Sequence, residues 1–372
     1  MDFSLNQEQE MFRGYVKKYL DNAGQTKMAR DSIKGNEDTV QQAMSGLSEL
    51  GCMAITISEQ YDGLGLGSLD LVPVLEEMGR ALLPGIYAET MAFAVPLLEK
   101  YGTDAQKERY LPEIASGNKT MTVAWMEPNM GYVTQGMETK ARVEGESYIL
   151  DGTKTLVPNG ASADYILVLS TTQIGHTFFI VHQEQLEDIQ KQEAFDESLQ
   201  LSQITFHHIK VPKEQVLGEA GKADILLEEG LLHMNAALCS LMVGSMEKIV
   251  SMAAEYAKIR EQFGQPIGRF QAIKHRIVDM KMELETARSL SYYANWALDT
   301  HAEDRAAAIY SARAYTTEAF IAASAANVQI HGGIGFTEEL DCHLFVKRAR
   351  YYEGYLGTVQ QNREKAALAL NW

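Results

Sequence analysis

The first third of the chain has the apolar spacing of amphipathic helices. One face of a predicted helix is formed by four apolar residues that recur three or four positions apart: Val40, Met44, Leu47 and Leu50. Gly51 follows as a stop signal, and similar spacing predicts a second helix over residues 71–78. The pattern therefore predicts an all-α N-terminal domain over residues 1–118.

From about residue 120 the pattern changes to short runs rich in β-branched and aromatic residues. The predicted strands cover residues 141–143, 148–150, 165–169, 177–181 and 204–206. Turn signals separate them, among them Asp151 followed by Gly152. A block of short strands of this kind predicts a β-barrel or sandwich domain over residues 119–222.

Helical periodicity returns at about residue 223 and continues almost to the end of the chain. Glycine-rich segments interrupt it at residues 264–268 and 331–335. Long helices with short breaks are typical of an antiparallel bundle, so a C-terminal four-helix bundle is predicted over residues 223–372. The fold class is therefore an α+β multidomain chain in the order α, β, α.

The charge balance excludes one class of partner. The chain has 33 Lys and Arg against 50 Asp and Glu, a formal net charge of -17. Proteins that bind nucleic acid without sequence preference need a basic face, so no nucleic-acid partner is expected. A negative net charge still permits an anionic ligand, because the field at one site can oppose the charge of the whole.

The cysteines and the apolar runs predict a cytoplasmic protein without membrane contact. Cys52, Cys239 and Cys342 are far apart and form no CxxC pair, which is typical of reduced thiols and predicts no metal site. The polar first residues do not resemble a signal peptide. No apolar run approaches the roughly 20 residues that span a bilayer.

Two motifs suggest ligand contacts, although each has a plain structural interpretation. Arg260 and Phe263 are three residues apart and are predicted to share a helix face, with Gly264 as its C-cap. An arginine there is either a solvated charge or a guanidinium fork for a phosphate. The run from His331 to Gly335 is either a simple turn or backbone that a ligand can approach closely.

Four segments in the same order resemble the acyl-CoA dehydrogenase family of flavoproteins. Residues 260–271 resemble the R-x-x-F-G…F-Q signature, and residues 329–335 resemble Q-x-x-G-G-x-G. Residues 126–128 read Met-Glu-Pro where the family has T-E-P, and residues 58–65 resemble its P-E-x-x-G-G-x-G turn. Together these segments extend the resemblance along essentially the whole chain.

The resemblance implies that FAD is the cofactor and that residues of the C-terminal region contact it: Arg260, Phe263, Gln271, Gln329, Gly332, Gly333, Thr358 and Gln360. Arg260, Phe263 and Gln271 would contact the pyrophosphate and adenosine of a neighbouring subunit's FAD. The protein is therefore expected to be an oligomer, either of identical chains or as a heterotetramer with a homologous subunit.

The resemblance also implies an activity in fatty acid metabolism. Family members oxidise an acyl-CoA thioester between Cα and Cβ to the 2-enoyl-CoA, and electron-transferring flavoprotein accepts the electrons. A glutamate in a Y-E-G-T segment removes the α-proton. The backbone N–H of that glutamate helps to polarise the thioester carbonyl.

The usual base position is altered in this chain. Aligning Gly357-Thr358 with G-T places Leu356 there, 21 residues after Gly335, which is the family spacing. Glu353 follows Gly335 by 18 residues and is the fallback base, with an ordinary surface glutamate as the plain interpretation. Leu356 cannot take a proton, but its N–H remains available to a thioester.

Other family positions differ as well. The alternative base position, on the first long helix of the bundle, is Met234. The first flavin loop has Met126, Asn129 and Tyr132 at family Thr, Gly and Ser positions, and Leu156 replaces a tryptophan. The pattern is similar to small subunits of heteromeric acyl-CoA dehydrogenases. Three interpretations remain: an active dehydrogenase, a half-site or non-catalytic subunit, or a flavoprotein without α-proton abstraction.

Overall fold

The computed structural model describes residues 4–128, 130–131 and 134–372. Its chain forms two compact units. The bundle unit joins Met1–Lys34, Leu71–Leu83 and Asn235–Trp372. The sheet unit joins Gly35–Asp70 and Pro84–Met234. The first helices of the chain therefore belong to the same compact unit as the C-terminal helices.

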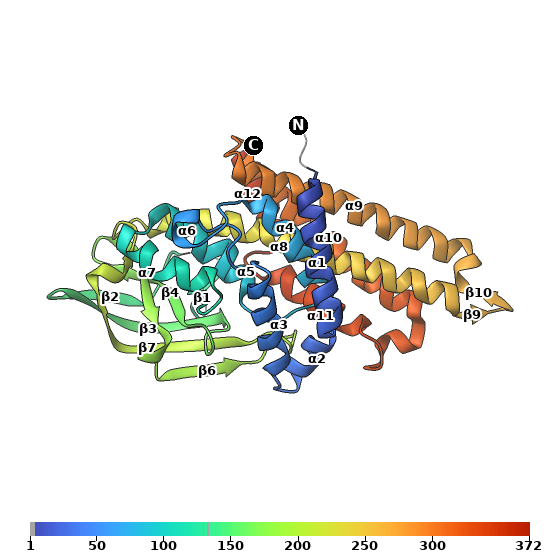
Figure 1. Ribbon diagram of the computed structural model, residues 1–372, viewed down its shortest axis with the longest axis horizontal. Coiled ribbons are helices and arrows are strands. Elements are labelled where there is room, and N and C mark those ends of the chain that lie inside the picture. Colours follow the sequence, from blue (N-terminus) through green and yellow to red (C-terminus); the bar gives the residue numbers. More distant parts are fainter. Residues whose placement is uncertain (1–3, 129, 132–133) are drawn as a thin grey trace. The chain divides into compact units, whose positions relative to one another are not determined.

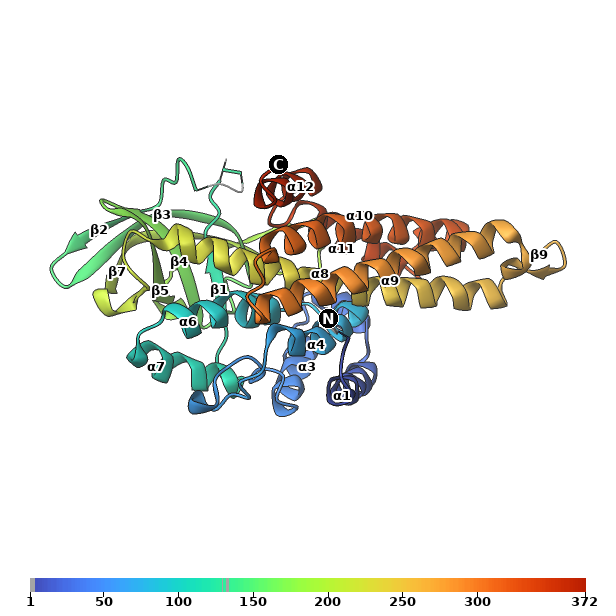
Figure 2. The ribbon, with the colours of Figure 1, turned by 90° about the horizontal axis from the view of Figure 1, so that it is seen from above.

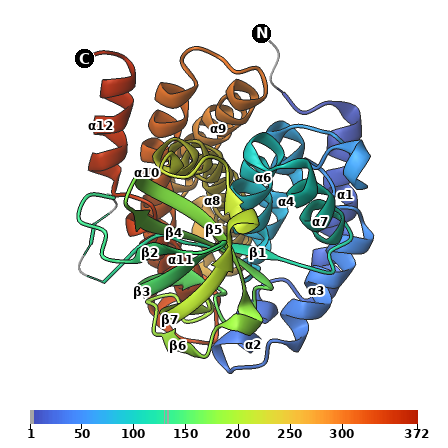
Figure 3. The same ribbon diagram turned by 90° about the vertical axis from the view of Figure 1, so that its left-hand side faces the viewer.

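The sheet unit is built on one eight-stranded sheet with the order β6-β7-β3-β2-β4-β5-β8 and with β1 beside β4 (Figure 3). Its strands are β1 (Met121–Ala124), β2 (Lys140–Glu144), β3 (Ser147–Pro158), β4 (Tyr165–Thr172), β5 (Gly175–His182), β6 (Asp188–Gln192), β7 (Leu201–Pro212) and β8 (Val216–Leu217). All five predicted strands are confirmed. The sequence missed β1 and β8, which are short, and β6, which is mostly polar.

The core of the sheet unit follows the strand alternation. Ile166 and Val168 of β4 are fully buried, as is Phe179 of β5. Successive side chains of a strand point to opposite faces, so residues two apart share this core. Phe179 also packs edge-on against Tyr148 of β3, with ring centroids 4.9 Å apart.

Short helices complete the sheet unit: α3 (Asp38–Glu49), α5 (Tyr87–Glu89), α6 (Val95–Tyr101) and α7 (Asp104–Ala115). The helix predicted from the apolar spacing of residues 40–50 is confirmed as α3, which buries Val40 and Leu47. The Thr90 hydroxyl donates to the Met121 carbonyl at 2.9 Å, which fixes the segment after α5 against β1.

The bundle unit consists of helices: α1 (Gln7–Ala23), α2 (Lys27–Ile33), most of α4 (Ser68–Ala81), the greater part of α8 (Ala223–Ile259), α9 (Gln271–Asp299), α10 (Arg305–His331), α11 (Cys342–Gly354) and α12 (Val359–Ala369). The predicted C-terminal bundle is confirmed, and α10 packs against α9, α11 and α12 (Figure 1). The helix predicted over residues 71–78 is confirmed as part of α4.

Two glycines bring the backbones of α4 and α8 together within the bundle unit. A Cβ on Gly79 would lie 1.9 Å from the Leu241 carbonyl oxygen. A Cβ on Gly244 would lie 1.7 Å from the Glu76 carbonyl oxygen. Only glycine fits at such a contact, because any side chain would overlap a rigid backbone.

One helix, α8, meets the length and composition of a membrane span, although no such run was expected from the sequence. α8 is long and apolar enough to span a bilayer, with a mean hydropathy of 1.3 in its most apolar window. That window is 72% buried inside the protein. Burial of this kind marks a core helix, which has the same length and composition as a spanning one.

The prediction that Arg260 and Phe263 share a helix face is wrong. α8 ends at Ile259, and the next residues form a hairpin of β9 (Glu261–Gln262) and β10 (Gln265–Pro266) at the end of α8 (Figure 2). Phe263 and Gly264 form its two-residue turn, with φ of 51° and 76°. Tight hairpins favour positive φ at both turn positions, so Gly264 is a turn residue and not a helix cap.

Candidate cofactor and substrate site

All eight residues predicted to contact the cofactor belong to the bundle unit and are exposed. Three of them, Arg260, Phe263 and Gln271, lie in or beside the hairpin at the end of α8. Phe263 at its tip is 92% exposed, and its ring meets that of Phe270 edge-on, with centroids 6.1 Å apart. The Ile267 N–H donates to the Arg260 carbonyl at 2.7 Å, which closes the base of the hairpin. The structure thus brings Arg260, Phe263 and Gln271 together on one solvent-facing projection.

The glycine-rich segment follows the end of α10. Gly332 has a φ of 64°, and a Cβ on Gly332 or Gly333 would have no atom within 4 Å. The backbone here is therefore open to a ligand. His331 stacks on Tyr256 of α8, with ring centroids 4.2 Å apart and planes at 27°. Because Tyr256 lies one turn before Arg260, this stack places the glycine segment and the hairpin at the same end of the bundle unit.

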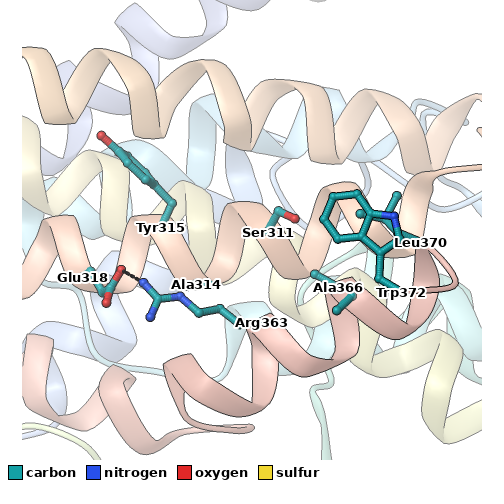
Figure 4. A pocket seen from close by; sticks show the side chains of 9 residues that line it. Ser311, Ala314, Tyr315, Glu318, Arg363, Ala366, Leu370 and Trp372 are labelled. Atoms are coloured by element: carbon teal, nitrogen blue, oxygen red, sulfur yellow. Dashed lines mark hydrogen bonds and ion pairs between the residues drawn. The ribbon is translucent and has the colours of Figure 1, made fainter.

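Thr358 and Gln360 lie at the start of α12. The Thr358 hydroxyl accepts from the Gln361 N–H at 3.3 Å as a helix cap. Arg363 pairs with Glu318 at 2.5 Å, and a groove farther along α12 is lined by Ser311 of α10 and by Trp372 (Figure 4). α12 therefore runs antiparallel to α10, and this groove lies at the opposite end of α12 from the predicted cofactor contacts.

The three candidate base positions differ in burial. Leu356 is 3% exposed and has a φ of 61°, between the end of α11 and the start of α12. Glu353 lies on α11, where its carboxylate pairs with Arg350 at 2.8 Å and its side chain is 43% exposed. Met234, the second position for a base, is 2% exposed. The role of Glu353 as a base stays a prediction.

A fully buried arginine of α10 contacts two backbone carbonyls just before Leu356, one in α11 and one directly after it. Arg313 donates from Nη2 to the Tyr352 carbonyl at 2.6 Å and to the Tyr355 carbonyl at 2.9 Å. Its Nη1 donates to the Thr317 hydroxyl. The sequence analysis missed Arg313. Its only signal was its place as the single charged residue between positions 306 and 317.

The sheet unit has a buried ion pair beside the predicted first flavin loop. Lys154 is 0% exposed, and its Nζ lies 2.8 Å from Glu127 Oε1. The Glu127 carboxylate also accepts from the backbone N–H groups of Glu138 at 2.6 Å and Thr139 at 2.9 Å. Burial lowers the pKa of Lys154 to about 8. Burial opposes ionisation of Glu127, but the Lys154 charge and these hydrogen bonds outweigh it and lower the Glu127 pKa.

Two further hydrogen bonds join β3 to the segment after β1. The Lys154 ammonium donates to the Trp125 carbonyl at 3.3 Å, and the Thr155 N–H donates to the Met126 carbonyl at 2.9 Å. Trp125 and Met126 are 4% and 7% exposed. Asn129 and Tyr132, whose substitution the sequence analysis noted, lie outside the described residues.

A β-bulge lies where the family resemblance expects a tryptophan. The pairing of β3 with β7 shifts register between Lys154 and Val157, and Leu156 has a φ of 52°. The Gln192 carboxamide of β6 supports the bulge, because its Oε1 accepts from the Leu156 N–H at 2.7 Å. Its Nε2 donates to the Thr155 hydroxyl at 2.8 Å. Bulges often change the direction of side chains beside active sites. The spacing of residues in the sequence gave no signal for the role of Gln192.

No cluster of three or more potential metal ligands from His, Cys, Asp and Glu occurs within residues 4–128, 130–131 and 134–372.

Three family models match consecutive parts of the chain. They are "Acyl-CoA dehydrogenase, N-terminal domain" over residues 6–118, "Acyl-CoA dehydrogenase, middle domain" over 122–207 and "Acyl-CoA dehydrogenase, C-terminal domain" over 225–370. The chain is 30% identical to the mitochondrial isovaleryl-CoA dehydrogenase of Pongo abelii, over 99% of this chain and 89% of that protein.

Solved structures agree with these matches. Butyryl-CoA dehydrogenase from Megasphaera elsdenii superposes with a TM-score of 0.94 at 26% identity, over 100% of both chains. A chain from a structure described as "Electron transferring flavoprotein of Acidaminococcus fermentans" superposes with a TM-score of 0.93 at 25% identity. That match covers 100% of this chain and 99% of the other.

Proposed function

Because this chain belongs to the acyl-CoA dehydrogenase family, we propose that it oxidises an acyl-CoA thioester between Cα and Cβ and releases the 2-enoyl-CoA. It is an oxidoreductase acting on CH-CH donors, and its cofactor is FAD. The observation that carries the proposal is the match of all three family domains in order along the chain.

The exposed residues of the bundle unit fit FAD. Gly332 and Gly333 leave backbone that a phosphate or ribose can approach, and Arg260 supplies a guanidinium fork for a diphosphate. FAD held by these residues would supply the hydride-accepting chemistry that oxidation at Cβ requires. Phe263 supports contact with a neighbouring subunit's cofactor, because its 92% exposed ring has most of its surface free for a partner. An oligomer of identical or homologous chains follows from this proposal.

The turn at Leu356 supports thioester binding. A backbone N–H directed at the thioester carbonyl stabilises the negative charge that develops there when the α-proton leaves. Leu356 has no acidic side chain, so we propose Glu353 as the residue that receives the α-proton. This role requires Glu353 to leave its 2.8 Å pair with Arg350. Both partners are about half exposed, and such pairs are worth only about 0–1 kcal/mol.

We propose electron-transferring flavoprotein as the electron acceptor and the cytoplasm as the compartment. The first rests on family membership and on the structural likeness to a chain described with such a flavoprotein. The second rests on Cys52, Cys239 and Cys342, which are free and buried thiols.

The visible spectrum of the purified protein, recorded without oxygen before and after acyl-CoAs are added, tests the proposed function. Oxidised-flavin bands that bleach with butyryl-CoA or isovaleryl-CoA are expected. Yellow protein that no acyl-CoA bleaches would contradict the reaction. A colourless protein that FAD does not reconstitute would contradict it too and would favour a subunit that needs a homologous partner.

Glu353→Gln tests the base separately. The variant should bind FAD like the parent and lose about 100-fold or more in the rate of flavin bleaching, as expected for loss of a general base. Arg350→Gln is the matched control, because it breaks the same ion pair and keeps the carboxylate. A Glu353→Gln protein that bleaches at the parent rate removes Glu353 from the mechanism.

A further inference from the structure

The peptide group between Tyr355 and Leu356 contains both the carbonyl that Arg313 contacts and the N–H that the proposed function assigns to the thioester. A peptide is planar and trans, so its C=O and N–H point in opposite directions. Whatever fixes the direction of the Tyr355 carbonyl therefore fixes the direction of the Leu356 N–H. Within the described part of the chain, that N–H is not paired with another protein group.

Arg313 fixes the carbonyl firmly. Its Nη2 lies 2.9 Å from the Tyr355 oxygen and 2.6 Å from the Tyr352 oxygen, so one nitrogen bridges the end of α11 and the following turn. The side chain is 0% exposed. Its other nitrogen donates to Thr317, one helical turn along α10. The guanidinium is thus fixed from both sides and cannot follow a rotation of the peptide.

The positive charge also changes the strength of the N–H as a donor. A cation on the carbonyl oxygen draws electron density through the amide, and hydrogen bonds in a chain strengthen one another. The effect is large where water is excluded, because the local dielectric is low. Leu356 is 3% exposed, so the Arg313–peptide contact lies in such an environment.

From this geometry we infer that Arg313 is a positioning residue: it orients the Leu356 N–H and polarises it toward the thioester carbonyl of a bound acyl-CoA. The inference rests on the proposed function and adds a residue to it. Arg313 touches neither substrate nor cofactor in this scheme, since it acts through the Tyr355–Leu356 peptide. Its removal is therefore expected to weaken carbonyl polarisation and turnover more than it weakens FAD binding.

Difference infrared spectroscopy of crotonyl-CoA, labelled with 13C at the thioester carbonyl and bound to the oxidised holoenzyme, measures this polarisation. In the parent protein the carbonyl band should move to lower wavenumber than in free crotonyl-CoA. In Arg313→Met at least half of that displacement should be lost, with kcat about 10–100-fold lower and the Kd for FAD within about 2-fold. Arg313→Lys keeps a charge but reaches fewer acceptors, so it should fall between the two.

Arg348→Met is the matched control. Arg348 is a buried arginine of α11, 2% exposed, whose guanidinium lies 5.8 Å from the Tyr352 ring and donates to the Leu82 carbonyl. Its loss removes a buried cation from α11, the helix that packs beside the α10 of Arg313. The band position in this variant should match that of the parent even where the melting temperature falls.

The outcomes separate this inference from the proposed function. A parent protein that neither bleaches with acyl-CoAs nor shifts the carbonyl band overturns both. A parent that bleaches, together with an Arg313→Met or Arg313→Lys protein whose band and kcat equal those of the parent, overturns only the role of Arg313. If Arg313→Met does not fold, the band of Arg313→Lys decides alone. If Arg348→Met loses as much of the band displacement as Arg313→Met does, the role of Arg313 is also overturned, because loss of any buried cation would then suffice.

Discussion

Lys154 in the sheet unit and Arg313 in the bundle unit are both 0% exposed cations, and the protein stabilises them by different means. Lys154 faces the carboxylate of Glu127, which in turn accepts from two backbone N–H groups. Arg313 faces two backbone carbonyls at the end of α11 and a threonine hydroxyl. One cation is neutralised by a full charge, and the other is stabilised by dipoles.

The difference follows from the kind of backbone around each cation. The C-terminus of a helix has carbonyls without partners and a partial negative charge, so a guanidinium there satisfies several acceptors at once. The loop after β1 instead presents N–H groups, which attract a carboxylate and not a lysine. Glu127, itself part of this loop, therefore accepts both from the Thr139 N–H and from Lys154.

The largest effect is expected when the ion pair of the sheet unit is broken. Lys154→Met leaves the Glu127 carboxylate buried without its cation and should lower the free energy of unfolding by about 3–5 kcal/mol. Urea unfolding measures this, with Lys213→Met, which breaks the exposed pair with Glu146, as the control. The double variant Glu127→Gln/Lys154→Met should recover part of the loss. A double variant less stable than Lys154→Met would contradict the role of charge.

A smaller effect is expected from the support of the bulge. Gln192→Ala leaves the Leu156 N–H and the Thr155 hydroxyl without their partner and should cost about 1–3 kcal/mol in urea unfolding. Gln190→Ala, on the same strand, removes an exposed side chain that donates to the Asp188 carboxylate and should change stability far less. Equal losses in the two variants would show that strand β6, and not the carboxamide, stabilises the bulge.

The two cations should also differ in how stability responds to pH. The pKa of Lys154 is about 8 in the folded protein against an ordinary value of 10.5. Between these values the unfolded chain binds a proton that the folded chain lacks, so stability rises with pH by at most about 1.4 kcal/mol per unit. This contribution is complete above pH 10.5 and is lost as the pH falls through 8. Between pH 8 and 10 the difference in urea midpoint between the parent and Lys154→Met should widen, whereas a constant difference would show that Lys154 does not titrate there.

The smallest effect on stability is expected at the hairpin tip. Phe263→Ala removes a ring that is 92% exposed and should change the free energy of unfolding by less than about 0.5 kcal/mol. If the ring stacks on an adenine, the affinity for FAD should fall by about 1–3 kcal/mol in a fluorescence titration. Phe195→Ala, at a 64% exposed aromatic of the sheet unit, should leave FAD affinity unchanged. Equal FAD affinity in both variants would remove Phe263 from the cofactor site.

Sequence reasoning succeeded where a local pattern determines the structure. The spacing of Val40 and Leu47 predicted α3, and alternation in residues 165–169 predicted β4. It failed at residues 260–266, because α8 already ends at Ile259 and the positive φ values of Phe263 and Gly264 form a hairpin turn instead of a further helical turn. A non-glycine residue rarely adopts such a conformation, so spacing alone favoured the helix.

The family resemblance named candidate contact residues, which stay predictions, and sequence spacing carried little signal for the buried residues that support them. Arg260, Gly332 and Leu356 belong to segments with a recognisable order, which one sequence displays. Arg313 contacts carbonyls 39 and 42 residues away, and Lys154 contacts a carboxylate 27 residues away. Such pairings depend on how helices and strands pack, which no local spacing records.

The glycine contact between α4 and α8 has a consequence for how this protein can vary. With Cβ positions 1.9 Å and 1.7 Å from opposing carbonyls, Gly79 and Gly244 permit no gradual enlargement by even one methyl group. A larger residue at Gly79 or Gly244 would meet the backbone of the opposing helix. No smaller side chain on that helix could compensate, because the clash is with a carbonyl. In a library of random variants, we expect these two positions to remain glycine while the apolar residues around them exchange freely among similar volumes.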